Sequence, residues 1–208
     1  MKMIPCSRTI LQPTRRTALA TFALAGLGAS VAAAETVDRL GVPGPIVFDG
    51  TSYGLAWSEH PSPTYYKQEY LPPGQGAASY ASMIILELVT NGASVASAVA
   101  AQTRMLNARK ATDPLVNFSL LQNQKTGEVL LDFILSAGSP QRIVEWNAYR
   151  YGPYRGGDGE QGVVLFVISQ RAYGDDDARV FLRDLKDKRM ATIGAFSRLP
   201  VPAVSISR

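Results

Sequence analysis

Aromatic and cationic side chains gather in two stretches of the chain, and their chemistry is that of recognition. Tyrosine, tryptophan and arginine dominate protein-binding surfaces because each buries a large area while keeping a polar group. The alternative is that about half of them simply pack on a sheet, as aromatic residues commonly do in strands. We expect a binding surface built from Trp146, Tyr149, Arg150, Tyr151, Tyr154 and Arg155 in one stretch and Tyr65 and Tyr66 in the other.

A catalytic interpretation centres on His60, the only histidine of the chain. Ser58, Glu59 and His60 are consecutive, but neighbours in an extended segment point to opposite faces and do not form a triad. The sequence also lacks the Gly-x-Ser-x-Gly turn of serine hydrolases. The pattern favours a loop histidine before Pro61. The alternative is a small-ligand binder or hydrolase with a cleft between helix and sheet, using as acid or base Glu59, His60, Asp132 or Glu145.

Two segments could hold ions, and both have simpler interpretations. The run Asp175 to Asp177 lacks the alternating ligands of a calcium loop, and acids at a helix start complement the helix dipole. The glycines between Gly152 and Gly159 lack the spacing and the Lys-Ser/Thr pair of a phosphate loop. We therefore expect neither a metal site nor a cofactor.

The first 34 residues have the order of an export signal. Cations come first, an apolar stretch follows over residues 18–31, and three alanines precede Glu35. Arg15 and Arg16 resemble the twin-arginine motif, although Ala18 stands where an aromatic residue is usual. Ordinary secretion is the alternative route. Cys6 would leave with this segment, so the processed chain would hold no thiol, and we expect a periplasmic or secreted bacterial protein.

The charge balance argues against nucleic acid as a partner. The chain has 21 basic and 17 acidic residues, and four of the basic ones lie in residues 1–34, which contain no acid. The remainder is neutral, whereas phosphate binding needs a concentrated cationic face. After residue 34, no apolar run approaches the roughly 20 residues of a membrane span.

The pattern after the signal predicts one domain. Residues 35–45 read as an extended lead-in, and residues 46–208 as a single α+β domain with helices covering a curved antiparallel sheet. Ser94 should cap a helix over residues 95–110, and the aspartate run should begin the last helix. We expect a short helical turn at residues 79–83 and strands at 46–48, 53–57, 64–70, 83–89, 116–120, 129–133, 142–151 and 163–170.

This order of elements resembles the PsbP-like fold family over roughly residues 46–200. Ile193 to Ser197 is similar to the short "I-x-x-F" motif that ends the family's last helix, and Val163 to Ser169 is similar to its central strand. The run Tyr70 to Gly74 resembles a "Y-x-P-x-G" step of secreted bacterial proteins. The resemblance implies a non-catalytic accessory, assembly or binding role.

These observations favour a secreted or periplasmic accessory protein without catalytic residues. It would bind an envelope or periplasmic protein partner through the tyrosine- and arginine-rich surface.

Overall fold

The computed structural model describes residues 36–138, 142–157 and 159–206, and residues Thr36–Arg208 form one compact unit. The predicted export signal, with Arg15, Arg16 and Cys6, lies outside the described residues. Ser139 and Pro140, which separate two of the expected strands, lie outside them as well.

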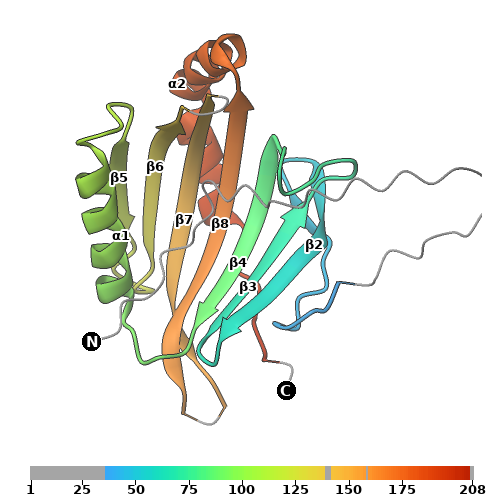
Figure 1. Ribbon diagram of the computed structural model, residues 1–208. Coiled ribbons are helices and arrows are strands. Elements are labelled where there is room, and N and C mark those ends of the chain that lie inside the picture. The colour runs from blue at the N-terminus through green and yellow to red at the C-terminus, as the bar shows by residue number, and fades with distance from the viewer. Residues whose placement is uncertain (1–35, 139–141, 158, 207–208) are drawn as a thin grey trace, which may run out of the picture. The chain divides into compact units, whose positions relative to one another are not determined.

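All the strands belong to one antiparallel sheet of eight, in the order β1-β2-β3-β4-β8-β7-β6-β5 (Figure 1). The strands are β1 (Ile46–Phe48), β2 (Thr51–Ser62), β3 (Tyr65–Leu71), β4 (Ser82–Val89), β5 (Asn117–Gln122), β6 (Val129–Ala137), β7 (Ile143–Arg155) and β8 (Gln161–Tyr173). The helices are α1 (Val95–Arg109) and α2 (Asp175–Arg198).

The expected fold class, an α+β domain of the PsbP-like kind, is wrong. The molecule is mostly β, a curled eight-stranded antiparallel sheet with two helices. The predicted helical turn at residues 79–83 is also absent from the described structure, where Ser82 and Met83 already belong to β4. The resemblance of the sequence to the PsbP-like family stays a prediction.

Strands β2 and β7 are longer than predicted, because each continues through a proline at a position that a strand tolerates. The sequence predicts a loop around Pro61, between the strands at residues 53–57 and 64–70. Pro61 instead lies in β2, where the register with β3 shifts between Glu59 and Ser62. Pro153 lies in β7 beyond the last pair with β6, at Tyr151, so one side of the strand is a local edge. A proline that cannot donate to a ladder is accommodated at bulges and edges.

The predicted helix after Ser94 is confirmed. The Ser94 side chain accepts a hydrogen bond from the Ser97 N–H at 3.1 Å, and the Ser97 hydroxyl oxygen accepts one from the Ser94 N–H at 3.0 Å. This reciprocal capping satisfies two backbone donors that the first turn leaves without partners. The last helix is confirmed too, with Asp175, Asp176 and Asp177 in its first turn.

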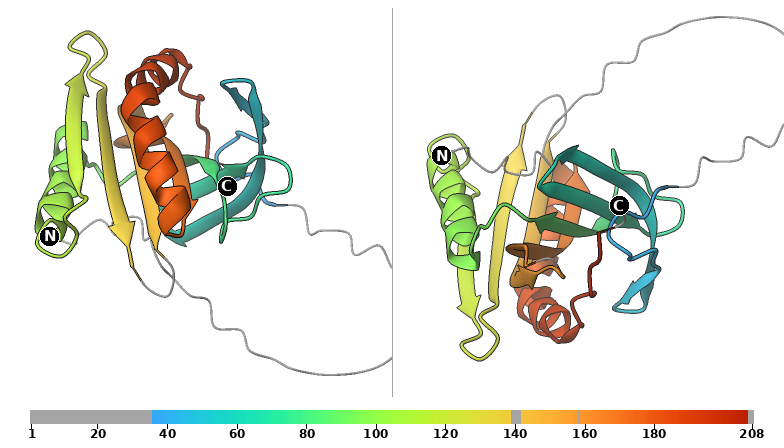
Figure 2. Two further views of the ribbon diagram at one scale, coloured as in Figure 1. Left: turned by 90° about the horizontal axis from the view of Figure 1, so that it is seen from above. Right: turned by 90° about the horizontal axis from the view of Figure 1, so that it is seen from below.

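The sheet curls around α2, which lies on its concave face (Figure 2). Alternate residues of the strands point to this face and form the apolar core with the helix. Helix α1 packs against β6, β7 and β8 on the opposite, outer face. The core includes Phe48, Tyr70, Ile84, Leu86, Leu88, Trp146, Phe166, Ile168, Ile193 and Phe196.

Within the described ranges, neither helix combines the length and the apolar character that crossing a membrane requires.

Candidate functional site

Most of the side chains predicted to form a binding surface are buried. Tyr66 and Tyr154 are half-buried, and Arg155 is exposed. The other five lie in the interior of the chain and therefore do not form an exposed rim: Tyr65, Trp146, Tyr149, Arg150 and Tyr151.

The strand alternation also divides these residues between two faces. Trp146 and Arg150 point to the concave face, where Trp146 Nε1 donates a 3.3 Å hydrogen bond to Asp132 and Arg150 donates one of 3.0 Å to the carbonyl of Phe196. Tyr149 and Tyr151 alternate with them and point to the outer face. Spacing along the chain therefore did not place the cluster on one surface.

His60 takes no part in an acid-base array. Its Nδ1 lies 3.1 Å from the carbonyl oxygen of Tyr65, and its ring stacks on that of Tyr66 with centroids 3.9 Å apart. The neighbouring Ser58 hydroxyl instead donates to the carbonyl of Val37. Glu59 is exposed at the same strand.

The two other proposed acids are held in separate buried networks. Asp132 accepts hydrogen bonds from Ser119, Trp146 and Arg189 on the concave side. Glu145 forms an ion pair with Arg171 and accepts from Asn147 on the outer side.

Tyr80 lies beside the Glu145 network. Its hydroxyl shares a 2.9 Å hydrogen bond with that of Ser169. Burial raises the pKa of Tyr80 well above its ordinary value, and the charge of Glu145 raises it further. Tyr80 is therefore a neutral hydroxyl at physiological pH.

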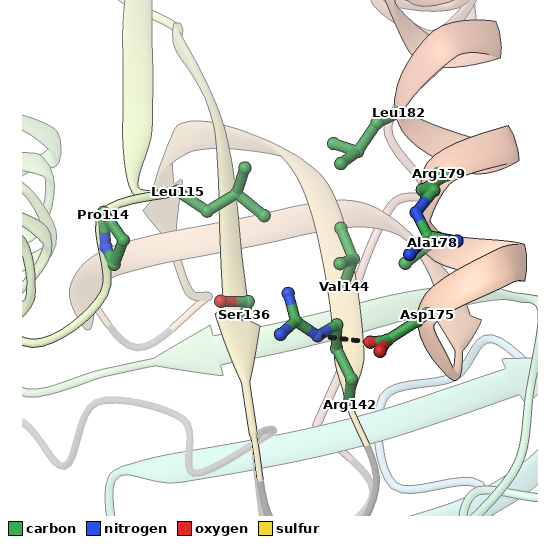
Figure 3. Close-up of a pocket in the computed structure, with 9 residues that line it drawn as sticks. All are labelled: Pro114, Leu115, Ser136, Arg142, Val144, Asp175, Ala178, Arg179 and Leu182. Carbon is green, nitrogen blue, oxygen red and sulfur yellow. Dashed lines mark ion pairs between the residues drawn. The ribbon is translucent and has the colours of Figure 1, made fainter.

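A pocket of about 380 Å³ lies between the first turns of α2 and the adjoining ends of β6 and β7 (Figure 3). Its lining is mostly apolar, with charged side chains on α2 and at the start of β7. It is formed by Pro114, Leu115, Ser136, Arg142, Val144, Asp175, Ala178, Arg179 and Leu182.

The turn from β8 into α2 positions the charged side of this pocket. Gly174 has a φ of 81°, a conformation that glycine adopts without strain, and its N–H donates a 2.8 Å hydrogen bond to the carbonyl of Arg142. The helix therefore begins directly beside the start of β7. Arg142 Nε and Asp175 Oδ1 consequently form an ion pair of 2.6 Å across the pocket.

The opposite side of the pocket is held by Asp113. Its carboxylate accepts hydrogen bonds from the Ser136 N–H at 2.6 Å, the Ser136 hydroxyl at 2.8 Å and the Leu115 N–H at 3.2 Å. Arg109 donates to the same carboxylate at 3.1 Å. Burial opposes ionisation, but these hydrogen bonds outweigh it and lower the pKa of Asp113 below its ordinary value.

Within the described part of the chain, the ion-pair partners of the pocket's two guanidinium groups are exposed. The side chains of Arg142 and Asp175 are 59% and 62% exposed, and Arg179 pairs with Asp176, which is also exposed. Ion pairs in water contribute about 0–1 kcal/mol. A bound anion can therefore compete for either arginine at little cost.

A protein-family model matches residues 40–201 of the chain. The chain belongs to that family. No curated protein and no solved structure matches the chain. The matched range contains the whole sheet, both helices and every residue that lines the pocket.

Sequence reasoning missed the pocket because its residues come from four separate segments. Arg142 and Arg179 carry no motif, and the loop before β5 supplies Pro114 and Leu115. A usable signal was the glycine at position 174 followed by the aspartate run, which marks a sharp entry into a helix.

Proposed function

We propose that this protein is a non-catalytic binding protein that takes a small amphipathic anion in the pocket beside α2. The observation that carries the proposal is a mostly apolar pocket lined by two arginines, Arg142 just before β7 and Arg179 on α2. Its volume of about 380 Å³ falls within the range of roughly 300–1,000 Å³ common for small-ligand sites.

The composition of the pocket indicates the ligand class. Arg142, Arg179 and Asp175 together carry a net charge of +1, and a guanidinium binds a carboxylate with two parallel hydrogen bonds. Val144, Leu115 and Leu182 offer apolar surface for the rest of the ligand. A short-chain carboxylate has both features.

The same lining supports binding rather than catalysis. Among the described residues of the pocket, Asp175 is the one carboxylate, and Arg142 holds it. Ser136 carries the one hydroxyl among these described lining residues, and that hydroxyl donates a hydrogen bond to Asp113. The pocket also lacks all four acids and bases that the sequence suggested for a hydrolase.

The cellular setting is part of the proposal and is supported by the sequence of residues 1–34. Cations, an apolar stretch and three alanines favour export to the periplasm or the exterior of a bacterium. A binding protein there would present the ligand to an envelope component or sequester it.

Calorimetric titration of the purified chain with octanoate tests the function. We expect saturable binding, and we expect Arg142→Ala to lower the affinity at least tenfold, because a hydrogen bond to a charged group contributes about 1.5–3 kcal/mol.

The matched control is Arg183→Ala, an exposed arginine of α2 outside the pocket, which should bind octanoate as the unmodified chain does. Equal losses in the two variants, or equally tight binding of uncharged octanol, would show that the pocket does not recognise an anion.

A further inference from the structure

The two edges of the sheet differ in how they are protected against further strands. An edge strand presents unpaired N–H and C=O groups, which proteins usually guard with bulges, proline, charge or a covering segment. Strand β1 pairs with β2 only up to Tyr53, so the rest of β2 is an edge. That edge contains two register shifts and Pro61, and Ser58 binds the lead-in beside it through the carbonyl of Val37.

Strand β5, at the other end of the sheet, has none of these devices (Figure 1). Its sequence is Asn-Phe-Ser-Leu-Leu-Gln, without a charged residue, a proline or a glycine. Its register with β6 runs from Asn117 to Gln122 without a shift. A regular, uncharged edge of this kind accepts an added strand readily.

The hairpin shows which main-chain groups of β5 face the free side. The Asn123 N–H donates a 2.9 Å hydrogen bond to the carbonyl of Glu128. In an antiparallel pair, residues bonded to the neighbouring strand alternate with residues that are not. The N–H and C=O groups of Phe118, Leu120 and Gln122 therefore point away from β6, to the side where no described strand follows.

The N–H of Phe118 supports this direction. It donates a 2.9 Å hydrogen bond to the side chain of Asn117 rather than to β6. Asn117 is exposed, so its side chain can rotate away when another acceptor approaches. The free side of β5 thus offers the main-chain donors and acceptors that bind an added strand in β-augmentation.

Two exposed leucines extend this edge onto both faces of the sheet. Leu120 pairs with Leu131 and Leu121 pairs with Leu130, so the two leucines point to opposite faces. Each is 47% exposed, which shows that neither helix covers β5 at this point. An added strand would shield both leucines from water, and that burial favours docking.

Lysines at both ends of β5 indicate the charge of the partner. Lys110 Nζ lies 4.7 Å from the ring centroid of Phe118, and Lys125 lies in the turn after the strand. Both are exposed, and neither belongs to an ion pair between described residues. Residues 91–127 contain four basic side chains and one acid, the buried Asp113. This flank is complementary to an acidic segment.

We propose that β5 binds an extended acidic segment of a partner protein as an added strand, with carboxylates of the segment beside Lys110 and Lys125. The main chain of Leu120 and Gln122 holds the segment, and the lysines select its charge. Residues 1–34 of the chain itself lack this chemistry, because they contain no acid. The site shares no residue with the lining of the anion pocket.

Fluorescence anisotropy of the full chain with a labelled peptide tests the proposal. The peptide alternates threonine and valine and has a glutamate at each end. We expect saturable binding that weakens as salt rises, because part of the attraction is between charges. A peptide with lysine at each end should bind more weakly, and so should one with proline at its centre, because proline lacks the N–H that strand pairing needs.

The variant Leu120→Pro removes one donor from the free side of β5. The N–H at this position does not face β6, so the hairpin keeps its hydrogen bonds, and proline is tolerated at such edge positions. We expect peptide affinity to fall about tenfold or more, since main-chain hydrogen bonds supply the affinity in strand addition. Leu120→Val keeps the N–H and an apolar side chain, and this matched control should bind as the unmodified chain does.

The variant Lys125→Glu tests the charge and stays informative if Leu120→Pro does not fold. It should lower both the affinity for the acidic peptide and the salt dependence of binding. Lys186→Glu, at an exposed position of α2, changes the net charge by the same amount and should leave binding unchanged.

Equal binding of the glutamate-ended and lysine-ended peptides would overturn the proposal, and so would unchanged binding by a folded Leu120→Pro chain. Sedimentation of the chain alone tests another occupant. A dimer that Leu120→Pro dissociates would show that a second copy pairs with β5, which would also overturn the proposal. Arg142→Ala should leave peptide binding unchanged, so this site and the anion pocket can fail separately.

Discussion

The two faces of the sheet are built from the same strands and both bury apolar side chains, but the outer face also buries Lys67, Glu87 and Glu145. In β4, Ile84, Leu86 and Leu88 enter the apolar core on the concave face, whereas Glu87 points to the outer face. Apolar burial is non-directional and needs only the removal of water. Polar burial needs a matched partner for every group. The charged groups of the outer face therefore need partners within the chain, such as the ion pair of Arg171 with Glu145.

The concave face also buries charged groups, and Arg150 shows how their hydrogen-bonding capacity is satisfied. Arg150 reaches the C-terminal end of α2, where it donates to the carbonyls of Phe196 and Leu199, and it pairs with Glu128 at 2.9 Å. Its guanidinium thus completes the end of a helix whose last carbonyls lack internal partners. On the outer face, the buried Asn147 Oδ1 accepts no hydrogen bond from a described residue.

The largest expected effect comes from the concave face. Phe196 is fully buried and stacks on Phe166 with ring centroids 5.0 Å apart. Phe196→Ala should lower the free energy of unfolding by about 4 kcal/mol, measured by urea denaturation, because it removes buried apolar area and leaves a cavity.

Val180→Ala, on the exposed side of the same helix, is its control and should change the free energy of unfolding by less than about 0.5 kcal/mol. Similar losses in the two variants would contradict a core centred on α2.

A smaller effect is expected where the outer face buries charge. Arg171→Met leaves the Glu145 carboxylate without its ion-pair partner and should lower the free energy of unfolding by about 3 kcal/mol. Urea denaturation of the double variant Arg171→Met with Glu145→Leu should recover most of that loss, since no buried charge then remains. A double variant no more stable than the single one would mean that the pair itself stabilises the fold.

The smallest expected effect on the free energy of unfolding is that of a substitution at Asp113, beside the pocket, and it depends on pH. Hydrogen bonds hold the folded pKa of Asp113 below the unfolded value of about 3.9. Its contribution is therefore complete well above the unfolded pKa, starts to decline as the pH approaches that value and is lost as the pH falls through the folded pKa. Asp113→Asn should cost about 1 kcal/mol at pH 7, and the difference in Tm between the two chains should shrink below pH 4. A difference that is constant from pH 7 to pH 2 would rule out this linkage.

Local elements were predictable because their causes are local. Ser94 and the aspartate run mark helix starts, and the strands predicted at residues 116–120 and 129–133 are confirmed as β5 and β6, which pair with each other. The predicted strand lengths were wrong at Pro61 and Pro153. A bulge and a local edge depend on how one strand pairs with its neighbours, which the sequence of that strand does not show. The predicted aromatic surface required the side chains to be exposed to solvent, and their spacing in the sequence does not reveal exposure.

The sequence alone determined the order of the elements, the caps of the helices, the neutral charge after residue 34 and the two-residue alternation that defines two faces of each strand. Only the tertiary structure decided which face receives α2, how far strands run through proline, and that Arg142, Asp175 and Leu115 share one pocket. Alternation and capping act between residues a few positions apart, whereas burial and pocket formation depend on which distant segments meet when the sheet curls.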